Sequence, residues 1–303
     1  MVRHFLPRGG LSLPPRPPPL PNPRRPPCYD ARGGILNKDI LNKDGGSAIM
    51  ELLDNARGGY RFLTGIPAFS SGAAAMPGFE VARVTLNRPL PYRSGFDAID
   101  AHLAGAGRPR QALCAIELRS PKPFSFDGFD EFNDGYRSIL SDWDILLPDH
   151  NPVARSNVAP VVAAPAEPSL YAFSYTAPSE KASASFIVAG AADVARQSLS
   201  ERAIVREGET SADAMAEKAA HVMAIMAARL AALGAGWADV TGVNVYTAEV
   251  LHPYLAETVL APMGATAIHG VHWHLARPPI EGLAFEMDVR GTARELRLAT
   301  DGD

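Results

Sequence analysis

Apolar residues recur at strand or helix spacing from about Met50 onward, and the first half of this region predicts five strands and two helices. The strands are runs rich in β-branched and aromatic residues, and they span 60–64, 80–86, 112–118, 153–162 and 170–176. Three- and four-residue intervals between apolar residues predict the helices. The first contains Phe96, Ile99 and Leu103 and ends at the glycines of 104–107, and the second covers about 126–146.

The second half repeats this order of elements. Strands are predicted at 183–189, 240–246, 269–275 and 283–289, and helices at 212–233 and 253–260. The methionine-rich stripe of the long helix could form an adaptable binding surface, but its spacing already satisfies a buried face. We therefore expect it to pack in the core. Thr210 with Asp213 offers a capping signal at the start of this helix.

Both halves read strand, helix, strand, helix, strand, strand, which an internal duplication of roughly 110–120 residues explains economically. The expected fold class is α+β, with two tandem domains that each form one mixed sheet with two helices on a single face. The expected boundaries are 50–178 for the first domain, 179–292 for the second and 293–303 for a tail.

Residues 1–49 have a different composition. Ten of the 27 prolines and five arginines lie within the first 27 residues, and proline fixes φ and removes a backbone donor. We expect a disordered, extended leader, either a dispensable extension or a ligand for a proline-recognition domain. A direct repeat of Ile-Leu-Asn-Lys-Asp at 35–44 follows, so the folded protein is expected to start near Met50, with the leader an upstream misreading or an added segment.

Composition and charge exclude several classes of function. Lys and Arg number 29 against 33 Asp and Glu, a net charge of −4, so nothing suggests a nucleic-acid partner. The sequence has no run of about 18 apolar residues, so no membrane partner is expected. Two cysteines, Cys28 and Cys114, are too few for a disulfide framework or a thiolate zinc site. A cytoplasmic location is the default, and Cys114 is expected to be a buried small hydrophobe rather than a nucleophile.

Several short motifs occur in a characteristic order. Ala112–Leu118 leads into a helix with Phe129, Phe132, Asn133 and Tyr136, and then into Ala154-Arg155-Ser156-Asn157-Val158. The second half repeats the pattern more loosely at 232–240, at Ala276-Arg277-Pro278-Pro279 and at Phe285-Glu286-Met287-Asp288. Over nearly all of 60–290 the chain resembles the reactive intermediate deaminases, the RidA/YjgF-like family. Segments 108–118 and 274–280 are similar to a tandem-domain subgroup, the 2-aminomuconate deaminases.

The resemblance implies hydrolysis of an enamine or imine acid to the oxo acid and ammonia, without a cofactor or a metal. A guanidinium offers a planar fork for a carboxylate, and Arg155 matches the family's carboxylate-binding arginine. Glu286 matches its strand-terminal glutamate, and Asn157 could orient substrate or water. Neither half contains both the arginine and the glutamate. One site could therefore be assembled across an interface, or catalysis could need only one of the two groups.

Three histidines and one arginine in the second half are further candidates. His274 or His269 could act on a proton or a substrate carboxylate, or could be structural. His272 and His274 share a strand face, which allows at most two imidazoles for a metal ion, so no zinc site is expected. Arg277 could be a second cation for a dicarboxylate or a surface residue.

The sequence thus predicts a cofactor-free deaminase for 2-aminomuconate or a close enamine acid. The predicted catalytic residues are Glu286, His274 and Asn157, and the predicted substrate-binding residues are Arg155, His269 and Arg277. The expected partner is a small-molecule carboxylate, and the resemblance favours a homotrimer with sites in clefts between domains. The alternatives are a chorismatase-like enzyme acting on a carboxylate-bearing ring and a non-catalytic metabolite-binding module.

Overall fold

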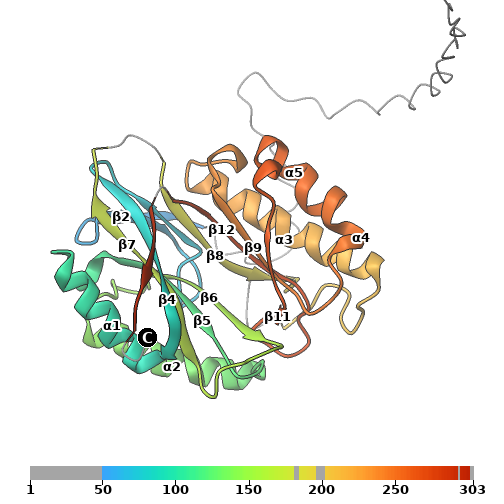
Figure 1. Cartoon of the computed structure of the whole chain (residues 1–303), viewed down its shortest axis with the longest axis horizontal. Coiled ribbons are helices and arrows are strands. Elements are labelled where there is room, and N and C mark those ends of the chain that lie inside the picture. Colours follow the sequence, from blue (N-terminus) through green and yellow to red (C-terminus); the bar gives the residue numbers. More distant parts are fainter. Residues whose placement is uncertain (1–49, 181–183, 196–201, 293, 301–303) are drawn as a thin grey trace, which may run out of the picture. The chain divides into compact units, whose positions relative to one another are not determined.

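The computed structural model describes residues 50–180, 184–195, 202–292 and 294–300 (Figure 1). The predictions for the leader at 1–49 lie outside the described residues. In the described part, strands form two mixed sheets that face each other, and helices cover the outer face of each sheet (Figure 1). The mixed α+β class predicted from the sequence is therefore confirmed.

The first sheet has six strands. Its order is β11 (Ala276–Arg277), β6 (Ala154–Pro160), β5 (Leu113–Arg119), β7 (Ser169–Pro178), β4 (Phe79–Pro91) and β13 (Arg294–Leu298). β6 runs parallel to β5 and β13 runs parallel to β4, whereas the other pairs are antiparallel.

The second sheet has seven strands. Its order is β1 (Leu52–Asn55), β2 (Tyr60–Leu63), β3 (Gly72–Ala75), β8 (Phe186–Ala192), β12 (Glu286–Gly291), β9 (Gly242–Tyr246) and β10 (His272–His274). Only β9 and β10 pair in parallel in this sheet.

The two halves of the chain exchange strands, which corrects one sequence-based expectation. The predicted strand 60–64 belongs to the first half, but as β2 it joins the second sheet through β3 and β8. In return, β13 lies within the predicted C-terminal tail and extends the first sheet beside β4. The expectation that each half forms its own sheet was wrong here, because hydrophobic periodicity identifies a strand but not its partner.

Helices α1 (Tyr92–Gly105) and α2 (Phe126–Asp142) cover the first sheet, as predicted. Ser125 caps α2 by accepting a hydrogen bond from the Gly128 amide. Phe96, Ile99 and Leu103 of α1 and Tyr136 and Leu140 of α2 pack on the inner strands. These contacts form one of the two larger cores.

Helix α3 (Ala212–Ala232) covers the second sheet, and its methionine-rich stripe is buried as expected. The cap is Ser211 rather than the predicted Thr210, since the Ser211 hydroxyl accepts from the Ala214 amide. No helix of the described residues is long and apolar enough to cross a membrane.

The predicted second helix of this half is irregular. The run consists of α4 (His252–Tyr254), a π-helical segment (Leu255–Leu260), α5 (Ala261–Met263) and a 3₁₀ segment (Gly264–His269). Pro262 lies within the run and lacks the amide that a continuous helix requires there. The expectation of two regular helices per domain was therefore wrong for the second half.

Smaller clusters fill the space between the sheets. Tyr60, Phe62, Val81 and Cys114 are fully buried there. Burial raises the pKa of the Cys114 thiol far above its usual value, so the thiolate is suppressed. The prediction of an inert, buried Cys114 agrees with this environment.

Candidate active site

Charged side chains from both sheets meet between the sheets, at alternate positions of their strands. In β12, Glu286, Asp288 and Arg290 alternate with Met287 and Val289, which pack in the core against α3. In the first sheet, Arg83 of β4 and Glu117 and Arg119 of β5 follow the same rule. Because successive side chains of a strand point to opposite faces, each strand contributes an apolar face to its helices and a charged face to the opposite sheet.

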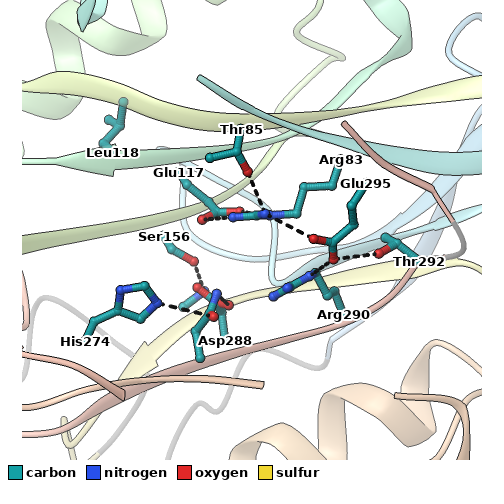
Figure 2. Close-up of polar contacts among 12 residues, drawn as sticks. Arg83, Thr85, Glu117, Leu118, Ser156, His274, Asp288, Arg290, Thr292 and Glu295 are labelled. Atoms are coloured by element: carbon teal, nitrogen blue, oxygen red, sulfur yellow. Dashed lines mark hydrogen bonds and ion pairs between the residues drawn. The ribbon is translucent and has the colours of Figure 1, made fainter. Parts of the chain in front are cut away.

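Arg83 and Glu117 form a two-point ion pair in this layer. Arg83 Nε and Nη2 donate to Glu117 Oε1 and Oε2 at 2.6 and 2.9 Å, and Nη1 donates to Thr85 Oγ1 at 2.8 Å (Figure 2). The two side chains are only 7% and 12% exposed. Burial opposes ionisation of Glu117, yet Arg83 lowers the pKa of this carboxyl to about 2. Glu117 is therefore a fixed negative charge.

Asp288 accepts hydrogen bonds from both sheets. Asn244 Nδ2 and Tyr246 Oη of β9 donate to its two carboxylate oxygens at 2.8 Å each, and the Ser156 hydroxyl of β6 is a third partner (Figure 2). Burial and the charge of Glu117 nevertheless raise the pKa of Asp288.

Glu286 lies two residues before Asp288 and is 3% exposed. Its carboxyl group packs against Gly190 of β8, close to the Ser156 hydroxyl, which also accepts from the Gly190 amide at 3.1 Å. Burial and the charge of Asp288 raise the pKa of Glu286 well above its usual value, although Arg119 and Arg155 oppose this shift. A carboxyl group with such a pKa can hold a proton near neutral pH and transfer it.

A narrow pocket opens within the charged layer. Its polar lining consists of Glu117, Ser156, Asp288, Arg155 and Arg290, and its apolar lining includes Ala115, Ile187 and Ala189. Pockets that combine ionisable groups with shifted pKa values are the usual place to look for catalysis. Among the described residues, no three His, Cys, Asp or Glu side chains are placed to share a metal ion.

Arg155, the predicted carboxylate-binding residue, is 2% exposed and directs its guanidinium toward α2. Nη2 donates to Asn133 Oδ1 at 2.6 Å, and the guanidinium carbon lies 4.6–5.7 Å from the ring centres of four aromatic residues, Phe69, Phe129, Phe132 and Tyr136. Nη1 has no hydrogen-bond partner among the described residues. Burial lowers the pKa of Arg155 to about 10, so the group stays charged at neutral pH.

Of the other two predicted catalytic residues, His274 lies near the layer. His274 stacks on Tyr246 with ring centres 4.9 Å apart, and its Nε2 lies 3.4 Å from Asn244 Oδ1. Burial and the charge of Arg119 lower the pKa of His274 to about 4, so its imidazole is neutral at pH 7. Asn157 is buried and accepts from the Ser120 hydroxyl at 2.9 Å.

His269 and Arg277 lie apart from these groups. Both side chains are exposed, His269 at the end of the 3₁₀ segment and Arg277 in β11. His269 instead lines a second small pocket with Thr241, Thr266 and His272. The structure thus brings Glu286 and His274 toward the inter-sheet layer and leaves His269 and Arg277 outside it.

Sequence reasoning missed most of the charged layer. Arg83, Glu117, Arg119, Asp288 and Arg290 were not among the predicted site residues. A signal was present: Glu286, Asp288 and Arg290 occupy every second position of a run whose other residues are Met and Val. In a strand covered by a helix on one face, such alternation indicates a polar face that is directed at another surface.

A family model and a similar protein of known name indicate the same family. Residues 52–296 match the family model described as 2-aminomuconate deaminase CnbZ. A 2-amino-5-chloromuconate deaminase of Comamonas testosteroni is 42% identical over 244 residues, which cover 80% of this chain and 96% of that protein. A crystal structure of a chorismatase aligns with a TM-score of 0.40 and 12% sequence identity over 79% of this chain and 78% of that one. By the extent of the family match and the identity to this relative, the chain belongs to the CnbZ family of 2-aminomuconate deaminases.

Proposed function

We propose that this protein is a hydrolytic deaminase that converts 2-aminomuconate, or a closely related enamine acid, to the 2-oxo acid and ammonia. Membership of the CnbZ family and the name of the Comamonas relative support the reaction and the substrate class. The observation that carries the proposal in the structure is the buried carboxyl pair Glu286 and Asp288, both with raised pKa values, beside a pocket lined by arginines.

The reaction needs one proton transfer and one water molecule. A proton added to the enamine carbon shifts the double bond to C=N and gives an iminium ion. Water attacks the iminium carbon and loses a proton, and the resulting carbinolamine expels ammonia to leave the C=O group. The proton taken up in the first step is returned in the later steps, so the net reaction consumes only water.

Glu286 suits the first step. Burial favours its protonated form, and a protonated carboxyl group is a general acid that becomes a general base once the proton has left. It could then receive a proton from the attacking water. Asp288, held by Asn244, Tyr246 and Ser156, helps to keep the proton on Glu286 through its charge.

His274 and Asn157 fit supporting roles. A neutral imidazole with a pKa of about 4 can orient water or substrate through a hydrogen bond, but it holds no proton to donate at neutral pH. Asn157 Nδ2 has no hydrogen-bond partner among the described residues, so it retains a donor that a substrate could use.

The substrate's carboxylate at the reacting end needs a fixed cation. The Nη1 of Arg155 supports the role predicted for this residue, because it is an unused donor on a buried, charged guanidinium. Arg155 also interacts electrostatically with Glu286. A substrate gripped by Arg155 would therefore have its reacting end near the proposed acid.

The strand order supports descent from a duplicated RidA/YjgF-like unit. In the first unit the chain runs β4, α1, β5, α2, β6, β7, and these strands lie in the sheet in the order β4-β7-β5-β6. In the second sheet β8-β12-β9-β10 arises in the same way around α3 and the irregular helical run, with the same parallel and antiparallel pairs. The domain boundaries, the homotrimer and the cytoplasmic location stay predictions.

Ammonia release from 2-aminomuconate by the purified full-length chain tests the proposal. The spontaneous rate in buffer and the rate with Glu286→Gln are measured beside it, and Glu281→Gln, at an exposed glutamate near β12, serves as the matched control. We expect wild type and Glu281→Gln to release ammonia equally fast. We expect Glu286→Gln to be slower by a factor of about 10² or more, the usual contribution of a general acid. A wild-type rate equal to the spontaneous rate would refute the function for this substrate, and an unimpaired Glu286→Gln would refute the site.

A further inference from the structure

The C-terminal strand β13 places a carboxylate between two buried arginines of different sheets. Glu295 Oε1 accepts from Arg290 Nε at 2.6 Å and from Thr292 Oγ1 at 3.3 Å, and Oε2 lies 3.5 Å from Arg83 Nη1 (Figure 2). The arginine side chains are 7% exposed, whereas the Glu295 side chain is 43% exposed. The carboxylate therefore sits where two buried cations meet solvent.

Arg290 has a hydrogen-bond donor that an anion could use. Arg83 already has both oxygens of Glu117 as partners, but Arg290 uses Nε for Glu295 and its Nη1 has no hydrogen-bond partner among the described residues. A guanidinium with unused N–H donors can hold a carboxylate through two parallel hydrogen bonds.

Gly242 of β9 makes room for this guanidinium. A Cβ at position 242 would stand 2.5 Å from Arg290 Cζ and 2.7–2.8 Å from both terminal nitrogens. The backbone of β9 thus forms one flat wall of the cation, which keeps the guanidinium in the inter-sheet layer.

The arginine pair is continuous with the candidate active site. Arg290 and Glu117, the partner of Arg83, line the same pocket as Asp288 and Ser156. Arg155 lines this pocket as well, so an elongated ligand with an anionic group at each end could have Arg155 as the partner of one end and the arginine pair as the partner of the other.

We propose that Glu295 occupies the binding site for the distal carboxylate of a dicarboxylate substrate, and that the substrate displaces it from Arg83, Arg290 and Thr292. The ligand class rests on the proposed function, because an aminomuconate has two carboxylates. Glu295 would then act as an internal competitor that lowers the affinity for dicarboxylates, since only a ligand with a second carboxylate has to displace it.

The surroundings of Glu295 allow this exchange. Four of the five residues of β13 are exposed, and among the described residues the strand pairs only with β4. The Glu295 side chain can turn toward water without uncovering a core, and a half-exposed carboxylate regains hydration when it leaves its partners. Burial opposes its ionisation, but Arg290 lowers the pKa of Glu295, so it competes as an anion at neutral pH.

The same contacts can also be interpreted as purely structural, with Glu295 holding the two arginines in place. The two interpretations predict opposite effects of removing the Glu295 charge on ligand binding. If Glu295 only supports Arg83 and Arg290, removing its charge leaves the cations less well held and weakens ligand binding. If Glu295 competes with the ligand, removing its charge strengthens the binding of dicarboxylates. The effect on a monocarboxylate of the same length should be much smaller.

The test uses two six-carbon dienoates that lack an amino group and cannot be deaminated. trans,trans-Muconate has a carboxylate at each end, whereas sorbate, with the same double-bond geometry, has a methyl group in place of one carboxylate. Titration calorimetry with the full-length chain compares wild type, Glu295→Gln, Glu295→Asp and Asp100→Asn. Asp100→Asn is the matched control. It removes an exposed carboxylate of α1 that pairs with Arg110, away from the inter-sheet layer.

We expect Glu295→Gln to bind muconate roughly ten-fold more tightly than wild type, the scale of one charge-assisted hydrogen bond. In Glu295→Asp the shorter side chain moves the carboxylate away from the arginines, so muconate binding should gain less, with the same sign. This variant replaces Glu295→Gln in the test if Glu295→Gln fails to fold. Sorbate binding and Asp100→Asn should show no gain. Adding Arg290→Gln to Glu295→Gln should abolish the gain.

Unchanged or weaker muconate binding in the folded Glu295 variants would overturn the inference, as would an equal gain for sorbate. Muconate binding is measured without catalysis, so the result stands apart from ammonia release. A wild type that deaminates 2-aminomuconate while Glu295→Gln shows no gain would leave the function intact and remove this site.

Discussion

The carboxyl group of Glu286 lies against the Cα of Gly190, on the neighbouring strand of the second sheet. A Cβ built on Gly190 would overlap Glu286 Oε1 and would stand 3.3 Å from the Glu286 carboxyl carbon and 3.2 Å from Ser156 Oγ. Gly190 does not have a positive φ, so the backbone conformation does not require glycine here. The space taken by the proposed acid requires it.

Gly190→Ala should therefore damage the site before it damages the fold. The added methyl group must displace the Glu286 carboxyl group or push β8 away from β12, and overpacking of this kind costs about 1–3 kcal/mol. We expect a loss of ammonia release much larger than the change in the free energy of unfolding by urea would produce. Gly105→Ala in α1, where a Cβ meets nothing within 4 Å, should leave ammonia release unchanged and raise the free energy of unfolding by at most about 1 kcal/mol. Wild-type activity in Gly190→Ala would show that the Glu286 carboxyl group has no fixed place in catalysis.

The pH profile of the reaction should report the interaction between Asp288 and Glu286. If Glu286 is active in its protonated form, activity falls as pH rises through its raised pKa. After burial, the charge of Asp288 is the largest cause that raises this pKa. Asp288→Asn removes the charge, so the pKa of Glu286 falls and the alkaline limb of kcat/KM should move to lower pH.

His274→Gln is the control for this measurement. The pKa of His274 is about 4, so its titration lies outside the range from pH 6 to 9. The position of the alkaline limb should stay where it is in wild type, even if the rate falls. A limb that is unmoved in Asp288→Asn, or that is lost in His274→Gln, would assign the titrating group to another residue.

The sequence predicted most of the helices and strands because local spacing determines them. The stripe of Met215, Val222 and Met226 faces the core as its periodicity requires, and Phe96, Ile99 and Leu103 do the same in α1. Strand pairing was less accessible, since β2 and β13 each join the sheet of the other half. Nothing local distinguishes a strand that stays from one that crosses.

Sequence reasoning named part of the candidate site through a family motif. Glu286 was proposed through this motif, whereas Arg83 and Glu117 belong to strands that looked like ordinary core. Their importance arises from the second sheet, which covers the helix-free face of the first sheet and makes it an interior. Arg155, the residue on which the sequence argument rested, is held by Asn133 and by aromatic rings of α2, among them that of Tyr136.

Glu117→Gln should destabilise the protein in a pH-dependent way. The substitution leaves the buried Arg83 without its strongest partner, and breaking a buried ion pair costs about 3–5 kcal/mol. The pKa of Glu117 is lowered to about 2 from a usual value near 4.3, so the ion pair stabilises the fold fully above that usual value. Its contribution is lost progressively as pH falls toward 2.

Urea unfolding of wild type and Glu117→Gln from pH 7 down to pH 3 measures this contribution. The difference in the free energy of unfolding should be constant between pH 7 and pH 5 and should shrink below about pH 4.3. A difference that stays constant to pH 3 would show that the Glu117 carboxylate does not titrate with folding.

Lys218 and Asp193 should support Glu286 from the other side of the second sheet. Lys218 Nζ lies 2.7 Å from Asp193 Oδ2, and the two side chains are 1% and 0% exposed. Asp193 also accepts from the backbone amides of Ala284 and Phe285, immediately before Glu286. The pair therefore fixes the start of β12, where the proposed acid begins the strand.

A double-mutant cycle on this pair separates its stabilising effect from that of an ordinary surface ion pair. Lys218→Met leaves a buried carboxylate without its cation and should lower the free energy of unfolding by about 3–5 kcal/mol. Adding Asp193→Asn should recover part of the loss, because the unpaired charge disappears while the amide oxygen still accepts from the backbone. The same cycle on Asp100 and Arg110, which are 40% and 43% exposed, should give a coupling energy below about 1 kcal/mol. Equal coupling energies in the two cycles would mean that burial adds nothing to the Lys218–Asp193 pair, and the start of β12 would then be held by its backbone alone.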